Sequence, residues 1–301
     1  MPGLLAGIGT WIADRWLQTV VLSGMLWVAT LVVAARLGQS HPFDAARLHT
    51  WLDEIATHRA GDSPAAILLA VAAALLTAGA SGLAAGGLGA LHQRLWGSDG
   101  SGPALAWLLR WRRRWWQRWY SERALRAVTA DLAEAPDPVT AAARRARAQR
   151  ALRLRTEREP HRPTRIGDAL HAVAVRLRAR YALDLDLAWP RLWAVLPDPL
   201  RADLSGARAA YDAAARLAGW GVLYAGLAVL WWPAALIGAA VLVTAVGRAR
   251  GAAAVLASLV EAAVDLHLTD LADQLGVRPD SDELTELGRA VGRRLGRPTS
   301  P

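Results

Sequence analysis

Apolar residues gather in three long runs, Leu17–Ala35, Ala65–Leu91 and Leu217–Val246, none of which contains Asp, Glu, His or Arg. The shortest run, of about 19 residues, forms about 28 Å of helix, close to the bilayer core thickness of about 30 Å. Elsewhere apolar positions recur three or four residues apart, which is the period of an amphipathic helix. The pattern therefore predicts an all-α, polytopic membrane protein with long amphipathic helices outside the membrane.

The first run is interpreted as a retained membrane anchor. A cleaved signal peptide is the alternative, but its apolar region is normally about 7–15 residues long and follows a basic leader. Here the run is longer, and the leader is neutral because Asp14 and Arg15 balance each other. The first two runs are thus expected to form a transmembrane pair.

The third run is bent at its centre, where Trp231 and Trp232 precede Pro233. Proline breaks a helix, and tryptophan is enriched where a membrane meets water. Each leg would hold about 14–16 residues, or about 21–24 Å of helix, which is short for a span. A spanning hairpin, a re-entrant hairpin and a single span all stay open. The spanning hairpin is preferred, and it gives four transmembrane helices, the last two short.

Amphipathic, charged helices flank this hairpin on both sides. Asp198 before Pro199 is an N-cap followed by proline at the first helical position, and Gly276 fits a C-cap at the far end. Four parts are predicted along the chain. They are a transmembrane pair over 1–96 with spans at about 17–35 and 65–91 and an external loop 36–63, an Arg-rich cytoplasmic helical region over 97–198, a long hairpin over 199–276 with membrane part 217–246 and cytoplasmic stalks, and a flexible tail over 277–301.

Charge is distributed unevenly and orients the chain. The net charge of +9 comes from 35 basic residues, all of them Arg, against 26 acidic residues. Residues 92–216 hold 24 Arg against 13 acidic residues, whereas the loop 36–63 holds 3 Arg against 4. Cytoplasmic loops of membrane proteins carry an excess of basic residues, so the long region is expected inside and the short loop outside. Both termini are then cytoplasmic in a bacterial plasma membrane.

Tryptophan and arginine alternate between positions 107 and 119, with Trp at every fourth residue. The preferred interpretation is an interfacial helix that binds anionic lipid headgroups. Packing of the Trp stripe on the cytoplasmic stalks is the first alternative. Nucleic-acid binding is the second and is disfavoured because no recognisable fold accompanies the residues. The residues predicted at the lipid interface, here and at the hairpin tip, are Trp107, Arg110, Trp111, Arg113, Arg114, Trp115, Arg118, Trp119, Trp231 and Trp232.

The second apolar run carries small residues at every fourth position, Ala78, Gly82, Gly86 and Ala90. Such a face lets two helices approach closely in lipid. We expect it to be a helix-packing face, either within the chain or between copies of it.

Few residues are suited to chemistry. The chain has no Cys, which excludes disulfides and thiolate metal sites. His49 and Asp53 stand four apart on the predicted external helix, but a zinc site needs further ligands, so a solvated face is favoured. No catalytic, cofactor or metal-binding residue is predicted. A transporter is not favoured, because the apolar runs lack the ionisable groups that couple transport.

Several short stretches resemble one known group of proteins. They are Asp168-Ala-Leu-His-Ala-Val-Ala-Val-Arg-Leu, Tyr181-Ala-Leu-Asp-Leu, Trp189-Pro-Arg-Leu-Trp-Ala-Val-Leu-Pro197, Trp231-Trp232-Pro233-Ala-Ala and Leu259-Val-Glu-Ala-Ala-Val-Asp-Leu-His267. They are similar to uncharacterised multi-spanning membrane proteins of actinobacteria such as streptomycetes, over most of the chain. The resemblance implies a plasma-membrane protein of a GC-rich Gram-positive bacterium. That group has no assigned activity, so the resemblance implies no residue roles.

Two functional hypotheses follow. The first is a non-enzymatic integral membrane protein that acts as a docking or scaffold platform for cytoplasmic protein partners, for further copies of itself and for anionic lipid. The second is an oligomeric pore-forming or membrane-disrupting effector, as in bacterial defence, which the small-residue face and the short hairpin legs favour. A membrane enzyme or a transporter ranks below both, because no residue set can be nominated for either.

Overall fold

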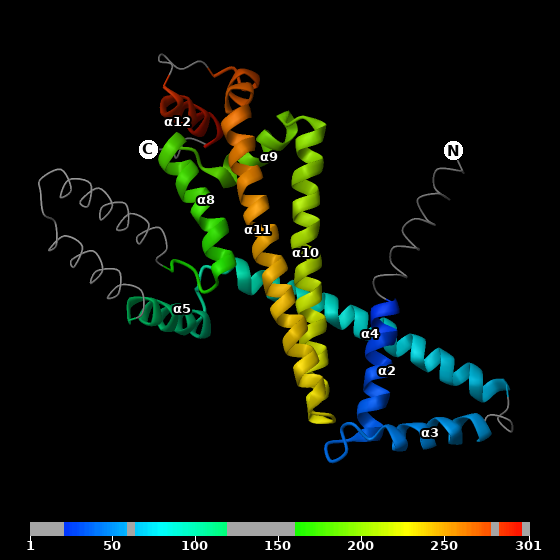
Figure 1. The fold of residues 1–301 in the computed structure, drawn as a ribbon. Coiled ribbons are helices and arrows are strands. Elements are labelled where there is room, and N and C mark those ends of the chain that lie inside the picture. The colour runs from blue at the N-terminus through cyan, green and yellow to red at the C-terminus, as the bar shows by residue number, and fades with distance from the viewer. Residues whose placement is uncertain (1–20, 59–63, 119–159, 278–282, 297–301) are drawn as a thin grey trace, which may run out of the picture. The chain divides into compact units, whose positions relative to one another are not determined.

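The structure is a computed structural model that describes residues 21–58, 64–118, 160–277 and 283–296. Over these ranges the secondary structure is helical and contains no strand, which confirms the all-α class (Figure 1). The elements are α2 (Leu22–Leu37), α3 (Ala45–His58), α4 (Pro64–Gly97), α5 (Pro103–Trp116), α8 (Arg165–Tyr181), α9 (Leu185–Val195), α10 (Asp198–Gly226), the 3-10 turn η3 (Leu227–Val229), α11 (Pro233–Gln274) and α12 (Leu284–Leu295).

Two helices in the described ranges are long and apolar enough to cross a membrane, Ala65–Gly97 in α4 and Pro233–Gln274 in α11. The prediction of four such helices is therefore confirmed only in part. Helix α2 is apolar but has 16 residues, and residues 17–20 of the predicted first span lie outside the described ranges. Helix α10 is long but not apolar enough to be counted, because its first half is charged and only its end belongs to the apolar run.

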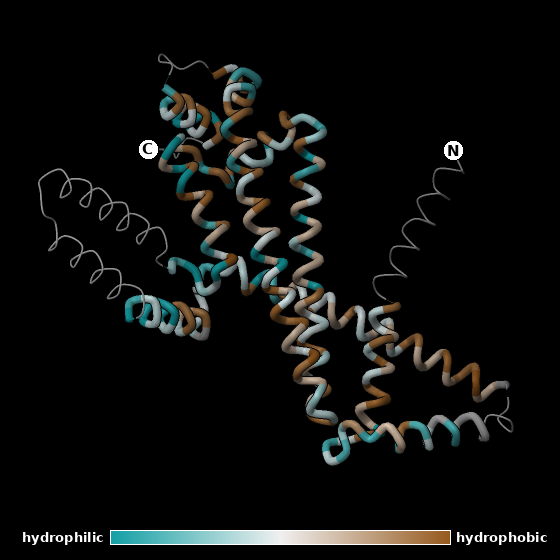
Figure 2. Tube along the Cα trace, in the orientation of Figure 1, coloured by the Kyte–Doolittle hydropathy of each residue, from teal (hydrophilic) through white to brown (hydrophobic). Residues whose placement is uncertain are grey.

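The chain divides into two compact units. Unit 1 comprises Met1–Gln93 and Tyr211–Ala249, and unit 2 comprises Arg94–Ala210 and Arg250–Pro301. The boundaries fall inside the long helices, so that the apolar part of the hairpin belongs to unit 1 and its charged flanks to unit 2. Apolar residues follow one another along the unit 1 part of the hairpin, whereas α3 is mixed in character (Figure 2).

Within unit 1 the third apolar run folds back on itself. Gly221 of α10 faces Leu242 of α11, where an added Cβ would lie 2.7 Å from the leucine Cγ. Gly238 approaches the backbone of Ala225 in the same way, with an added Cβ 2.6 Å from its nitrogen. These contacts make the two helices antiparallel neighbours, joined through η3. The run is a helical hairpin and not one continuous helix.

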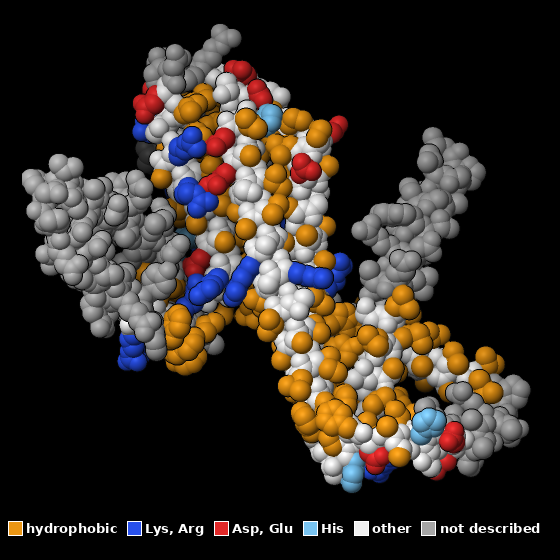
Figure 3. Space-filling view, in the orientation of Figure 1, with side chains coloured by type: hydrophobic (Ala, Val, Ile, Leu, Met, Phe, Trp, Pro, Cys, Tyr) orange, Lys and Arg blue, Asp and Glu red, His pale blue; other side chains and the backbone are white. Residues whose placement is uncertain are grey.

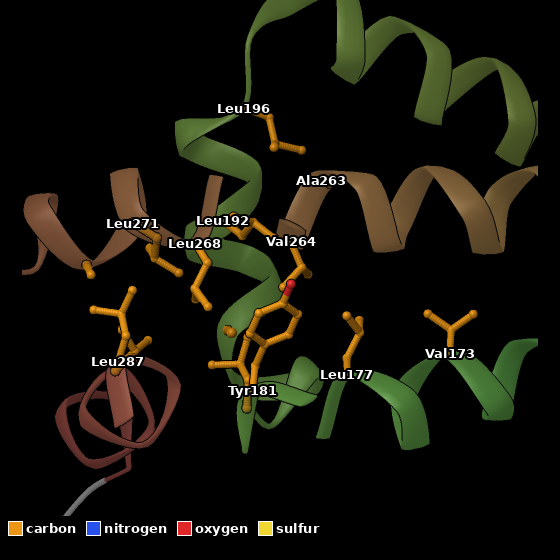
Figure 4. Packing of buried hydrophobic residues seen from close by; sticks show 14 of the residues in the cluster. Val173, Leu177, Tyr181, Leu192, Leu196, Ala263, Val264, Leu268, Leu271 and Leu287 are labelled. Carbon is orange, nitrogen blue, oxygen red and sulfur yellow. The ribbon is translucent and has the colours of Figure 1, made fainter. Parts of the chain in front are cut away.

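Unit 2 is built around one apolar core. Tyr181 at the end of α8 points between Leu177 of its own helix and Val264 and Leu268 of α11 (Figure 4). Its hydroxyl donates a 2.6 Å hydrogen bond to Oδ1 of Asp265. Further ion pairs join α8 to α11, and the space-filling view shows basic and acidic side chains side by side there (Figure 3). These pairs are partly exposed and contribute little beside the apolar burial.

Local sequence signals explain the ends of these helices. Helix α10 begins at Asp198, as the Asp198-Pro199 pair predicts. Gly276 has φ of 66°, a left-handed conformation that glycine adopts without strain. The Val277 N–H donates to the Ala272 carbonyl at 2.9 Å, and the Gly276 N–H to that of Asp273 at 3.1 Å. This is a Schellman motif, so Gly276 ends the helix as predicted.

Candidate functional site

Helix α5 carries the alternating Trp and Arg residues. It follows a glycine- and serine-containing linker and begins with Pro103 at its first position, where the missing N–H costs nothing. Gly102 before it is extended, which separates α5 from the preceding helix. Neither α5 nor the two residues after it contain Asp or Glu. The helix is therefore strongly basic.

One face of α5 presents Trp and Arg together to the exterior. The exposed fractions are 61% for Trp107, 55% for Trp111 and 48% for Trp115. At about 100° per residue, these three tryptophans and three exposed arginines, which are named below, fall within an arc of about 140° around the helix axis. Hydrophobic and basic side chains accordingly gather over α5 (Figure 3). The exposed arginines of this face are Arg110, Arg114 and Arg118.

On the opposite side of α5, two other arginines bond residues of the rest of unit 2. Nη2 of Arg112 lies 2.6 Å from Oδ2 of Asp168, and its Nη1 donates to the Arg162 carbonyl at 2.7 Å. Nε of Arg113 donates to the Pro160 carbonyl at 2.9 Å. Arg113, which was predicted at the lipid interface, thus bonds α5 to a residue before α8, and its place at the lipid interface stays a prediction. At about 100° per residue, Arg113 lies about 100° from Arg114 and about 60° from Arg110, on the side toward the Pro160 carbonyl.

Asp168 organises the segment to which α5 is attached. Its Oδ1 accepts the backbone N–H groups of His161 at 2.9 Å and Arg162 at 2.7 Å, while Oδ2 meets Arg112. Thr164, the N-cap of α8, accepts from the Gly167 N–H at 3.0 Å and donates to the Trp96 carbonyl at 2.9 Å. Charge-assisted bonds of Asp168, which are the stronger kind, thereby join α5 to the start of α8, and the neutral bond of Thr164 adds the end of α4.

A histidine lies beside this cluster. Nη2 of Arg162 is 3.0 Å from Nδ1 of His171, and Arg162 also forms an ion pair with Asp99. Burial, followed by the charges of Arg162 and His161, lowers the pKa of His171, and the carboxylate of Asp168 opposes the shift. The neutral imidazole can accept the hydrogen bond from Arg162. The lowered pKa therefore favours this hydrogen bond at neutral pH.

The two tryptophans of the hairpin tip have different surroundings. Trp231 is partly buried, and its indole N–H donates to the Pro42 carbonyl at 2.9 Å. Trp232 remains 43% exposed and meets Phe43 in a T-shaped contact. Trp119, the last tryptophan of the predicted stripe, lies outside the described residues.

The close contacts that α4 makes within the chain follow a different register from the predicted packing face, which was expected to pack within the chain or between copies. Ala78 is buried against α2, where an added Cβ at Gly24 would lie 2.3 Å from the Ala78 carbonyl oxygen. The close contacts then continue at Ala85 and Gly89, whereas Gly86 faces open space and Ala90 is exposed. A helix has 3.6 residues per turn, so a face in contact with others alternates between steps of three and four. Residues spaced strictly four apart therefore move progressively away from the face that contacts other helices.

Metal-binding geometry is not assembled in the described ranges, where no group of three His, Asp or Glu side chains could hold an ion. His49 and Asp53 are 3.9 Å apart and both highly exposed. His267 and Asp270 are 2.8 Å apart on the surface of α11. Each is a pair on a single helix.

Sequence reasoning missed two polar residues that position these elements, Asp168 and Gln39. Asp168 was noted only as part of a resemblance, although an acidic residue in the first turn of a helix is a known signal. Gln39 follows α2 and bonds the hairpin tip through contacts far apart in sequence. No local pattern indicates such a partner.

Comparison with protein-family models, with curated proteins and with solved structures finds no match to this chain. The resemblance to actinobacterial membrane proteins thus stays a prediction.

Proposed function

We propose that this chain is an integral membrane protein that anchors a cytoplasmic helical platform, unit 2, and holds α5 of that platform against anionic lipid. The observation that carries the proposal is that the two sides of α5 have different surroundings. Arg112 and Arg113 attach the helix to the folded unit, while its opposite face offers Trp and Arg outward. Trp prefers the headgroup region, and arginine neutralises lipid phosphates.

The apolar surface of α4 supports membrane insertion. Leu68, Leu69, Leu76 and Leu83 are each at least 70% exposed. Contiguous apolar surface on this scale is costly in water and is expected where lipid covers it. In this proposal α2 and α10 complete, with α4 and α11, the four membrane segments.

The hydrogen bonds of Gln39 support the proposed topology. Its side chain joins the end of α2 to the hairpin tip, donating to Ala228 and Val229 and accepting from Trp232. Two segments bonded in this way must lie on the same side of a membrane. If the basic regions are inside, then the α2–α3 loop and the tip both lie toward the outer side of the membrane.

Topology can be tested by cysteine labelling, because the natural chain has no Cys. In intact cells, a membrane-impermeant maleimide should label His49→Cys, whereas Arg293→Cys should be labelled only after the membrane is opened. Carbonate extraction should leave both variants in the membrane fraction. Recovery in the soluble fraction, or labelling of position 293 from outside, would reject the proposal.

The lipid role of α5 can be tested with matched charge variants of the full chain. The double variant Arg110→Gln/Arg114→Gln removes two exposed charges from α5, and Arg289→Gln/Arg293→Gln removes two from α12. The proteins would be reconstituted in equal amounts of phosphatidylglycerol and phosphatidylcholine, and the retained lipids measured by native mass spectrometry. At about 1 kcal/mol for each near-surface arginine, the α5 variant should lose about 2 kcal/mol of preference, or roughly 30-fold.

An equal loss in both double variants would mean that net charge, and not α5, attracts anionic lipid. The protein-docking part of the proposal needs its own test. Site-specific crosslinking from unit 2 in cells should yield a defined partner that is absent when crosslinking starts from α3. The same products from both positions would count against a docking role for unit 2.

The second candidate function, an oligomeric pore, is favoured by the open small residues of α4. Side chains added at Gly79, Gly86 or Gly87 would meet nothing within 4 Å. A second α4 could approach closely there. Dye-loaded vesicles should then leak when the protein is incorporated, and Gly86→Ile should abolish the leak while the protein stays inserted. Vesicles that remain sealed would remove this candidate.

A further inference from the structure

The hairpin tip in unit 1 leaves backbone polar groups without helical partners, and one side chain bonds three of them. Nε2 of Gln39 lies 2.7 Å from the Ala228 oxygen and 2.9 Å from the Val229 oxygen. Its Oε1 accepts the Trp232 N–H at 3.2 Å. A single side-chain amide therefore bonds three backbone groups of the turn between α10 and α11. In hydrocarbon, where water cannot replace such partners, an unpaired backbone group is costly.

The depth of the tip follows from the length of the legs. Gly221 faces Leu242 and Gly238 faces Ala225, a register that puts Arg216 level with Arg248 to within about one residue. Both arginines are exposed, and the residues between them include no Asp, Glu, His or Arg. From Arg248 back to Pro233 is about 22 Å of helix, against a core of about 30 Å. With the arginines at the inner headgroups, the tip ends below the outer ones.

Two aromatic rings stand at this tip. Phe43, from the α2–α3 loop, is 72% exposed, and Trp232 is 43% exposed. The ring centroids are 5.8 Å apart, and the planes cross at 89°. The bonds of Gln39 and the 2.9 Å bond from Trp231 to Pro42 hold the two loops together behind the rings. The pair is thus a fixed apolar projection at the end of the apolar hairpin.

We propose that Phe43 and Trp232 form a wedge that inserts between the headgroups and acyl chains of the outer leaflet, and that Gln39 permits this depth by satisfying the backbone of the turn. The inference rests on the proposed membrane anchoring and adds the lipid region that the tip contacts. Lipid is the occupant because the leg length keeps the rings short of the outer water phase. Tryptophan favours this boundary region, and the apolar ring of Phe43 is covered by the acyl chains there.

The test uses single cysteines in the full chain, Phe43→Cys and Trp232→Cys, labelled with the fluorophore NBD in vesicles of phosphatidylcholine and phosphatidylglycerol. Arg293→Cys in unit 2 serves as the control. Lipids carrying a spin label at the headgroup, in the upper acyl chain or at the bilayer centre report depth by quenching. Both tip positions should give blue-shifted emission, quenched most by the upper-acyl label. Position 293 should give emission typical of water.

Two results would overturn the wedge. Tip emission typical of water, quenched by iodide, would place the rings outside the bilayer or under a second protein, and strongest quenching at the bilayer centre would place them too deep. Carbonate extraction separates these failures from failure of the anchoring itself, since a protein without a wedge stays in the membrane fraction. Gln39→Leu should shift the label at 232 toward water, whereas an unchanged depth would remove the role of Gln39.

Discussion

The contact between α4 and α10 at Gly219 predicts a large effect from one methyl group. An added Cβ at Gly219 would lie 2.1 Å from the Ala85 oxygen, 2.9 Å from the Ala85 carbonyl carbon and 3.1 Å from the Gly89 nitrogen. These are backbone atoms, which cannot turn aside as the end of a flexible side chain can. To restore a contact of 3.4 Å from 2.1 Å, the helices must separate by about 1.3 Å.

The magnitude of the Gly219→Ala effect combines two opposing terms. Overpacking of a well-packed contact costs about 1–3 kcal/mol, and a backbone clash belongs at the upper end. Alanine stabilises a helix by up to about 1 kcal/mol relative to glycine. The free energy of unfolding should therefore fall by about 2 kcal/mol. In Gly206→Ala, on the same helix with nothing within 4 Å, only the second term acts, and stability should rise by about 0.5–1 kcal/mol.

The assay is equilibrium unfolding of the full chain in mixed micelles with increasing SDS, followed by circular dichroism. Gly86→Ala on α4 completes the set, because an added Cβ there meets nothing within 4 Å. It should leave stability unchanged or raise it. Destabilisation by Gly86→Ala equal to that by Gly219→Ala would refute the reasoning, since α4 would then pack through the strict four-residue face.

Two further predictions concern unit 2. Gly288→Ala should destabilise the attachment of α12 by about 1–3 kcal/mol, because an added Cβ there meets the Tyr181 backbone oxygen. Gly292→Ala on the same helix should not destabilise it, because an added Cβ there meets nothing within 4 Å. Thermal unfolding of both variants measures the difference. Tyr181→Phe should cost about 1–2 kcal/mol below pH 10, since it removes the bond to Asp265. Burial, then that hydrogen bond and the Asp265 charge, raise the pKa of Tyr181 above 10.0, so the stabilisation is complete below pH 10 and is lost as the pH rises through the folded-state pKa. Denaturant unfolding of both proteins at several pH values should show the difference shrink, and a constant difference would contradict this account.

The register of the small residues shows what the sequence leaves undecided. Ala78 is buried in a contact within the chain, whereas Gly86 meets nothing within 4 Å and Ala90 is exposed, because a spacing of four leaves that contact face after about two turns. Gly and Ala are abundant throughout this run, so several faces of α4 look equally suitable in the sequence. Only the position of α10, with Gly219 against Ala85, selects one of them.

The Trp and Arg helix shows a similar limit. The spacing of Trp107, Trp111 and Trp115 predicts a shared face, and the structure exposes all three. The spacing could not assign the arginines, because Arg110 and Arg113 look alike in the sequence. Arg113 is distinguished by the Pro160 carbonyl, which lies 47 residues further along the chain.

The sequence by itself determined the helical class, the apolar runs, the break before Pro233 and the helix ends at Asp198 and Gly276. These features depend on periodicity, proline and glycine chemistry and caps, all of which act within a few residues. Only the tertiary structure decided which helix faces meet and that Gln39 closes the hairpin tip. That decision rests on atoms brought together across 189 residues, and one amide can bond the turn only after both segments have folded.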